Sequence, residues 1–193
     1  RGYARISQLA KYYIGGLLAH ANALMAFCAP TTNSYKRLVP GYEAPVNLVY
    51  SMRNRSAAVR IPVYTENPKT KRVEFRPPDP ACNLYLAFAV MLGAGLEGIK
   101  TNYPLPEPVE ENIYHMSAAR QKKFEIRTLP RNLEEAVKLM EKSHLLKETL
   151  GDHIFAKFIA NKKAEIEEYN TNVSGEFEKQ VSDYEIKKYL PFL

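Results

Sequence analysis

The chain has 193 residues, an apolar fraction of 46% and a formal net charge of +6. This length suffices for one domain with its own core, and the apolar fraction argues against wholesale disorder. The basic charge favours anionic partners such as phosphates, carboxylates, nucleic acid or an acidic membrane surface. The two cysteines lack CxxC spacing, which predicts free thiols and a reducing compartment.

The first expected element is a helix over residues 5–29 that ends at Pro30. No Asp, Glu, Lys or Arg occurs between Tyr12 and Pro30, so by length this stretch is also a candidate membrane span. The polar His20 and Asn22 and the lack of interfacial anchors favour a buried helix instead. We therefore expect His20 to be a core histidine with satisfied hydrogen bonds rather than a ligand.

A long loop is expected next, over residues 31–45, because Pro, Gly, Asn and Ser recur along it. It contains Arg37 near its start and Glu43 near its end. Long loops in compact domains are often lids or binding loops. One hypothesis is a lid that closes Glu43 over a reacting centre and excludes water. The alternative is a surface loop with an exposed glutamate.

Three short strands should follow, over residues 46–52, 57–64 and 70–76. Because side chains alternate along a strand, Arg72, Glu74 and Arg76 share one face of the third strand. Arg60 lies on the corresponding face of the second strand, so these guanidiniums are expected to surround Glu74. Further cations should enter from the neighbouring turns, namely Arg53, Arg55, Lys69 and Lys71.

Such a cluster is costly unless an anion neutralises it, and the planar fork of arginine fits phosphate oxygens. A carboxylate at its centre, here Glu74, can bind a divalent cation together with substrate phosphates. The functional hypothesis is therefore a triphosphate or phosphoryl-transfer site with a metal ion. Two alternatives stay open. One is a solvated strand face with Glu–Arg pairs, and the other is a nucleic-acid surface, which the lack of an aromatic ladder disfavours.

The remainder of the chain is expected to be mostly helical. Asp79 should cap a helix that runs to about Lys100, and prolines interrupt residues 101–130. Beyond Asn132 we expect helices over residues 132–142, 145–151, 153–171 and 174–190. The pattern predicts an α+β fold in which helices flank an antiparallel mini-sheet. A mixed half, residues 1–100, and an all-helical half, residues 101–193, would belong to one domain.

Several long motifs follow one another in an order and spacing typical of a single enzyme family. They are Asn33–Pro45, Ser51–Pro62, Lys71–Pro80, Asn83–Phe88 and Gly95–Ile99. Together they resemble class I glutamine synthetase, the bacterial and archaeal type, strongly over about half of the chain and more loosely to its end. The resemblance implies that residues 1–193 are the C-terminal portion of that family's catalytic domain. Residues 1–100 would contribute to the nucleotide and glutamate site. The family's other metal ligands and its small N-terminal domain would lie outside this sequence.

The resemblance implies an activity: ATP-dependent ligation of ammonia to L-glutamate through γ-glutamyl phosphate, with Mg²⁺ or Mn²⁺. It implies catalytic roles for Glu43 and Arg55, and binding of the substrate glutamate by Arg37, Glu43 and Arg76. It also implies nucleotide contacts from Arg55, Arg60, Lys69 and Arg72, and metal ligation by Glu74. The family's members are cytoplasmic dodecamers, so a homo-oligomer is expected, with no nucleic-acid or membrane partner.

Two other functions remain open at this point. A related enzyme could join glutamate to a polyamine or ethanolamine, and a structural homologue could keep the fold without catalysis. The intact set of arginines and carboxylates disfavours the second. If the chain is part of a ligase, we expect it to be inactive alone because it lacks part of the site, and the full-length protein to be the active species.

Overall fold

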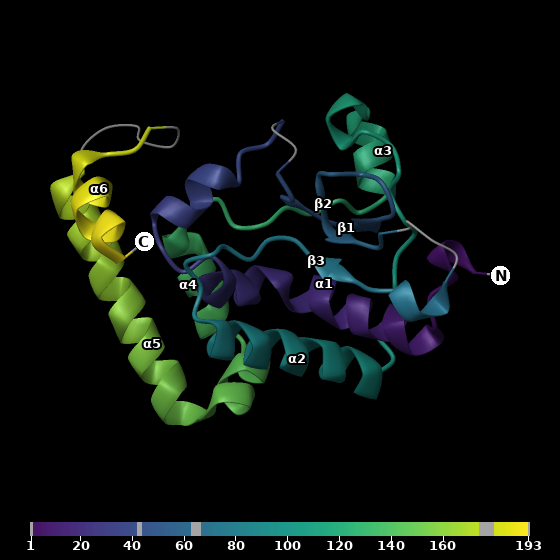
Figure 1. Ribbon diagram of the computed structural model, residues 1–193, viewed down its shortest axis with the longest axis horizontal. Helices are drawn as coiled ribbons and strands as arrows, with labels where there is room; N and C mark the ends of the chain where they lie inside the picture. The colour runs from purple at the N-terminus through teal and green to yellow at the C-terminus, as the bar shows by residue number, and fades with distance from the viewer. Residues whose placement is uncertain (1, 42–43, 63–66, 174–179, 193) are drawn as a thin grey trace.

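The computed structural model describes residues 2–41, 44–62, 67–173 and 180–192. Within these ranges, helices surround a small sheet, which confirms the α+β class (Figure 1). The helices are α1 Gln8–Cys28, α2 Leu84–Lys100, α3 Ala118–Lys123, α4 Leu133–Glu141, α5 His144–Asn172 and α6 Asp183–Tyr189. The strands are β1 Asn47–Ser51, β2 Ala57–Arg60 and β3 Glu74–Phe75.

Helix α1 forms the centre of the core because it is apolar around most of its circumference. Its side chains Leu24 and Phe27 are at most 1% exposed. It lies between the sheet and α2, and it also packs against α4 (Figure 1). Two glycines bring α1 and α2 together, since a Cβ atom on Gly98 would lie 2.6 Å from the backbone nitrogen of Gly16. The expected buried helix is confirmed, and no helix in the described ranges is long and apolar enough to cross a membrane.

The sheet has the order β1-β2-β3 and is mixed rather than antiparallel throughout. Strands β2 and β3 are antiparallel, as expected, but β1 and β2 are parallel. The reason lies in residues 52–56, which run back along β1 instead of forming a hairpin beside its end. The backbone and side-chain nitrogens of Asn47 both donate to the carbonyl of Ser56, at 3.2 and 3.3 Å, so β2 starts next to the start of β1.

Helix α2 begins four residues later than the sequence pattern predicts. Its N-cap is Asn83, whose side chain accepts a hydrogen bond from the Leu86 amide at 3.2 Å. Asp79 instead closes a separate turn, accepting from the Ala81 amide at 2.8 Å, and its own amide donates to the Cys28 carbonyl at 2.7 Å. This bond to the end of α1 fixes Asp79 outside the helix.

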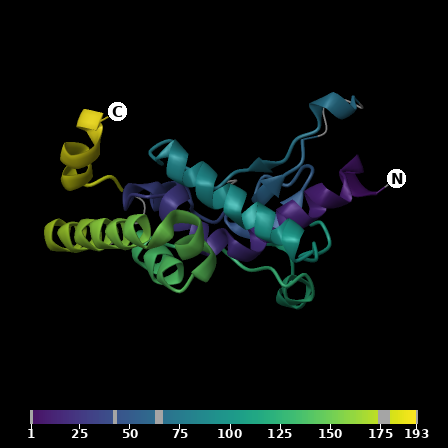
Figure 2. The ribbon, with the colours of Figure 1, turned by 90° about the horizontal axis from the view of Figure 1, so that it is seen from below.

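The C-terminal part is helical, as expected. Helix α5 changes direction at Gly151, whose φ of 76° lies in the left-handed region, which agrees with the expected break between two helical pieces. Helix α6 lies beside the distal part of α5 (Figures 1 and 2). It is shorter than expected, and part of the expected segment, residues 174–179, lies outside the described ranges.

Two sequence expectations about single side chains have different outcomes. Cys28 and Cys82 are free thiols, as predicted, with Cys28 buried. His20 stacks on Tyr103, with ring centroids 5.8 Å apart, but among the described residues its buried Nε2 atom has no hydrogen-bond partner. The hydrogen bonding expected of this histidine therefore stays a prediction. Burial lowers the pKa of His20, and the nearby Glu97 carboxylate acts in the opposite direction.

Candidate nucleotide and substrate site

The antiparallel pair β2–β3 brings a glutamate between two arginines. Arg60 is the cross-strand partner of Glu74, so both side chains lie on one face of the sheet. Arg60 donates to Oε2 of Glu74 from Nε at 3.2 Å and from Nη2 at 2.9 Å. Arg76 lies two residues beyond Glu74, and its Nε atom is 3.8 Å from Glu74 Oε1. The alternation predicted from the sequence is thus confirmed for these three residues.

Arg76 is held by backbone carbonyls and lies within reach of several other positive charges. Its Nη1 atom donates to the backbone carbonyls of Arg55 and Ala57, the latter at 3.2 Å. Burial lowers the pKa of Arg76, and so do the charges of three other arginines, while Glu74 raises it; those arginines are Arg60, Arg55 and Arg37. The charges of Arg60, Arg55 and Arg37 therefore all act on the Arg76 guanidinium, while Arg60 and Arg76 flank Glu74. An incoming phosphate or carboxylate would relieve their repulsion. We call these five residues, Arg37, Arg55, Arg60, Glu74 and Arg76, the arginine cluster.

Arg37 reaches the cluster from a different element. It is the last residue of the 3₁₀ helix η2, Asn33–Arg37, which interrupts the expected loop. Its Nη2 atom donates to the carbonyls of Pro77 at 2.5 Å and Pro78 at 3.3 Å, and its Nε atom lies 3.8 Å from Oδ2 of Asp79. The segment that follows β3 therefore holds Arg37 next to Arg76.

The turn before Arg55 is held by an acidic residue that the sequence analysis did not identify. Glu110 lies in the proline-interrupted segment, where no local pattern indicates a function. Its carboxylate accepts from the Ser51 hydroxyl at 2.9 Å, the Met52 amide at 2.9 Å, the Arg53 amide at 3.3 Å and the Tyr3 hydroxyl. Burial alone would raise the pKa of Glu110, but these hydrogen bonds together hold it below its usual value. Glu110 thus fixes the turn that leads to Arg55.

Three predicted site residues are not part of this geometry. Lys69 lies in the 3₁₀ helix η3, Pro68–Thr70, and Arg72 precedes β3, which starts only at Glu74; both side chains are exposed. Glu43 lies outside the described residues. The roles expected of these three residues stay predictions.

The described residues contain no group of three or more His, Cys, Asp or Glu side chains that could hold a metal ion by themselves. A cavity of about 570 Å³ lies elsewhere, lined by α1, α2, the end of α4 and the start of α5, and shares no residue with the arginine cluster. The chemistry of the cluster therefore comes from converging charges, with Glu74 as its carboxylate.

Comparison with known proteins identifies the family of this chain. The family model for the glutamine synthetase catalytic domain matches residues 1–189. The chain belongs to this family. Glutamine synthetase from Thermotoga maritima is 46% identical over 185 residues, which cover 96% of this chain and 40% of that protein. The enzyme from Methanococcus voltae is 47% identical over 186 residues, with the same coverage of both chains.

A third glutamine synthetase, from Frankia alni, is 64% identical over 115 residues, or 60% of this chain and 24% of that protein. The chain spans about 40% of the length of the bacterial and archaeal relatives that match it almost throughout. Its membership confirms the resemblance seen in the sequence motifs.

Proposed function

We propose that this chain supplies the phosphate-binding and glutamate-binding arginines of an enzyme that ligates ammonia to L-glutamate. ATP would first phosphorylate the γ-carboxylate, and ammonia would then displace phosphate from γ-glutamyl phosphate. The observation that carries the proposal is that Arg60 and Arg76 flank Glu74 while the charges of Arg37 and Arg55 also act on Arg76. Phosphoryl transfer depends mainly on positioning and on neutralising charge, and these residues can supply both.

The proposed roles follow from where each side chain originates. Arg60 is the last residue of β2 and would contact ATP phosphates, together with Lys69 and Arg72. Arg55 and Arg76 are linked, because the guanidinium of Arg76 donates to the carbonyl of Arg55. With this link, Arg55 would stabilise the transferred phosphoryl group while Arg76 contacts glutamate.

Arg37 reaches the same place from η2 and would bind a carboxylate of glutamate. Glu43 follows it six residues later and is proposed to act as the lid and to help deprotonate ammonium.

The residues present fit a divalent cation that is held largely by substrate. Arg60 occupies Oε2 of Glu74, whereas Oε1 lies 3.8 Å from Arg76, which is longer than a hydrogen bond. Mg²⁺ commonly combines one or two carboxylates with phosphate oxygens and water. Glu74 would therefore be one ligand of Mg²⁺ or Mn²⁺. When bound, the cation would neutralise phosphate charge and orient the transferred group.

Assembly and location are proposals for the complete product of the gene. We expect a homo-oligomer of the kind implied by the family resemblance, a dodecamer, acting in the cytoplasm. The relatives matched almost throughout are about two and a half times as long as this chain. The tests below therefore use the complete gene product.

The activity can be tested by measuring ADP release from the purified gene product. The release should require Mg²⁺ or Mn²⁺, glutamate and ammonia together, and hydroxylamine should trap the acyl phosphate as γ-glutamyl hydroxamate. Turnover with a polyamine or ethanolamine in place of ammonia would assign a different amine acceptor. No ADP release with any amine would refute the proposed catalysis.

A further inference from the structure

Helix α6 carries a buried carboxylate that the proposed reaction does not use. Glu185 is 2% exposed, which is rare for an acidic residue. Its Oε2 atom accepts a hydrogen bond from Lys36 Nζ at 2.5 Å, across 149 residues of sequence. The same carboxylate closes a capping box with Ser182 at the start of α6. One side chain thus joins the end of the chain to η2, the element that ends at Arg37.

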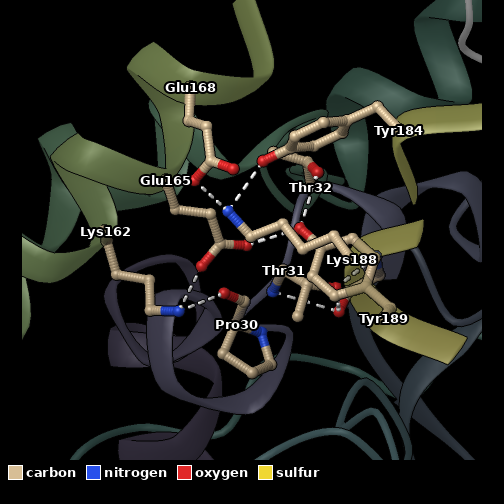
Figure 3. A network of polar contacts seen from close by, with 10 residues as sticks. Pro30, Thr31, Thr32, Lys162, Glu165, Glu168, Tyr184, Lys188 and Tyr189 are labelled. Atoms are coloured by element: carbon tan, nitrogen blue, oxygen red, sulfur yellow. Dashed lines mark hydrogen bonds and ion pairs between the residues drawn. The ribbon is translucent and has the colours of Figure 1, made fainter. Parts of the chain in front are cut away.

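Two further contacts join α5 and α6 to the segment just before η2 (Figure 3). The Tyr189 hydroxyl lies 3.0 Å from the Thr32 hydroxyl and donates to Glu165 at 2.7 Å. Lys162, which is 8% exposed, donates to the Pro30 carbonyl at 2.8 Å and to Glu165 at 2.7 Å. The C-terminal helices therefore hold this segment at three points along residues 30–36.

The geometry of η2 separates the contacts of its last two side chains. Successive residues of a 3₁₀ helix point about 120° apart. Lys36 points towards α6 and also donates to the carbonyl of Gln180, which precedes that helix. Arg37 instead extends to the carbonyls of Pro77 and Pro78 beside the arginine cluster. A rotation of η2 that released Lys36 would also turn Arg37. The contact between Lys36 and Glu185 can therefore control where Arg37 points.

The negative charge of Glu185 is not needed for its local role. The capping box requires an acceptor for the Ser182 amide, and a glutamine oxygen can serve as one. What glutamine cannot supply is charge compensation for Lys36, whose side chain is 13% exposed. Buried ion pairs add little net stability, and their best-attested use is to fix the register of an element.

We propose that Lys36 and Glu185 form a positioning pair that orients η2 so that Arg37 meets the substrate glutamate. This inference rests on the proposed glutamate-binding role of Arg37. The pair acts through Arg37 and does not touch substrate. Its loss should therefore affect the use of glutamate and leave the binding of ATP almost unchanged.

The test is Glu185→Gln in the complete gene product, with initial rates measured against glutamate at saturating ATP and against ATP at saturating glutamate. We expect KM for glutamate to rise about tenfold, equivalent to about 1.4 kcal/mol, and KM for ATP to stay within about twofold of its wild-type value. The matched control is Glu168→Gln, which breaks another Lys–Glu contact between α5 and α6. Its partner is Lys188, and among the described residues neither side chain bonds to residues 30–37.

A second variant guards against misfolding, because removing one partner of a buried ion pair can destabilise the fold. Lys36→Met combined with Glu185→Gln removes both charges and should show the same selective rise in KM for glutamate with a near wild-type melting temperature. Unchanged KM for glutamate, equal effects on both substrates, or failure of both variants to fold would overturn the positioning role. A wild-type protein without glutamate-dependent ADP release would instead overturn the proposed function itself.

Discussion

The substitution Glu74→Gln should raise the concentration of divalent cation that the enzyme needs. It removes the carboxylate at the centre of the arginine cluster but keeps an oxygen that can accept from Arg60. The shape of the side chain is preserved, so the change is one of charge. The side chain of Glu74 is 35% exposed, so its surroundings are intermediate between bulk water and the protein interior.

The size of the effect follows from that exposure. Two unit charges 4 Å apart interact by about 1 kcal/mol in water and about 4 kcal/mol near a protein surface. For a side chain that is one-third exposed, a loss of about 2–3 kcal/mol is expected, which corresponds to roughly 30-fold to 150-fold in affinity. The Mg²⁺ concentration at half-maximal rate should therefore rise by about that factor at a fixed ATP concentration.

The assay is a Mg²⁺ titration of ADP release by the complete gene product. The matched control is Glu111→Gln, because Glu111 also accepts from Nε and Nη2 of an arginine, Arg120, but lies outside the cluster. We expect the control to keep the wild-type Mg²⁺ requirement. If Glu74→Gln also keeps the wild-type Mg²⁺ requirement, Glu74 is not a metal ligand, and the metal role proposed for the arginine cluster is refuted.

Three further substitutions test other parts of the structure. Arg37→Lys loses the planar fork, so we expect KM for glutamate to rise at least tenfold in initial-rate assays with little change for ATP. Glu110→Gln weakens the hydrogen bonds that hold the turn before Arg55, and because Glu110 is exposed the loss of stability should be only about 0.5–1 kcal/mol by denaturant titration. Gly98→Ala would place a Cβ against the backbone of α1, so we expect it to lower stability by about 1–3 kcal/mol, with Gly2→Ala near neutral as control.

The pH dependence of Glu110→Gln gives a separate check. Hydrogen bonds hold the pKa of Glu110 below its usual value of 4.5 in the folded protein. The stabilisation should be fully present above about pH 4.5 and lost as the pH falls through the folded-state pKa. The stability difference between wild type and variant should therefore shrink in acid. A stability difference that stays constant down to pH 3 would argue against this role for the charge of Glu110.

For Gly98→Ala, an unchanged free energy of unfolding would argue against the tight contact of α1 and α2.

Alternation along a strand was enough to predict the centre of the site. Arg60, Glu74 and Arg76 meet because the side-chain period of two is a local property that the sequence displays directly. Strand direction is not local in this sense. The parallel pairing of β1 and β2 depends on Asn47 bonding to Ser56, and nothing in the composition of residues 52–56 indicates that the chain turns back there.

The start of α2 illustrates a second limit. Asp79 and Asn83 are both good N-cap residues four positions apart, so the sequence offers two starts for the same helix. Tertiary contacts decide between them. The Asp79 amide donates to the end of α1, and its carboxylate lies 3.8 Å from the Arg37 guanidinium. A residue expected to cap a helix thus helps to hold a proposed substrate-binding side chain.

The site also depends on residues far from it in sequence. Glu110 fixes the turn before Arg55, and Glu185 holds the element that ends at Arg37. Each acts on a backbone segment about 60 or 150 residues away, so neither could be identified from local pattern. Both belong to residues 101–193, which the sequence predicts to be the all-helical half of the same domain. Carboxylates from that half hold the segments that lead to two of the four arginines. The division into a site-bearing and a helical portion therefore does not separate function from scaffold. A substitution in α6 that releases Lys36 should therefore raise KM for glutamate more than KM for ATP.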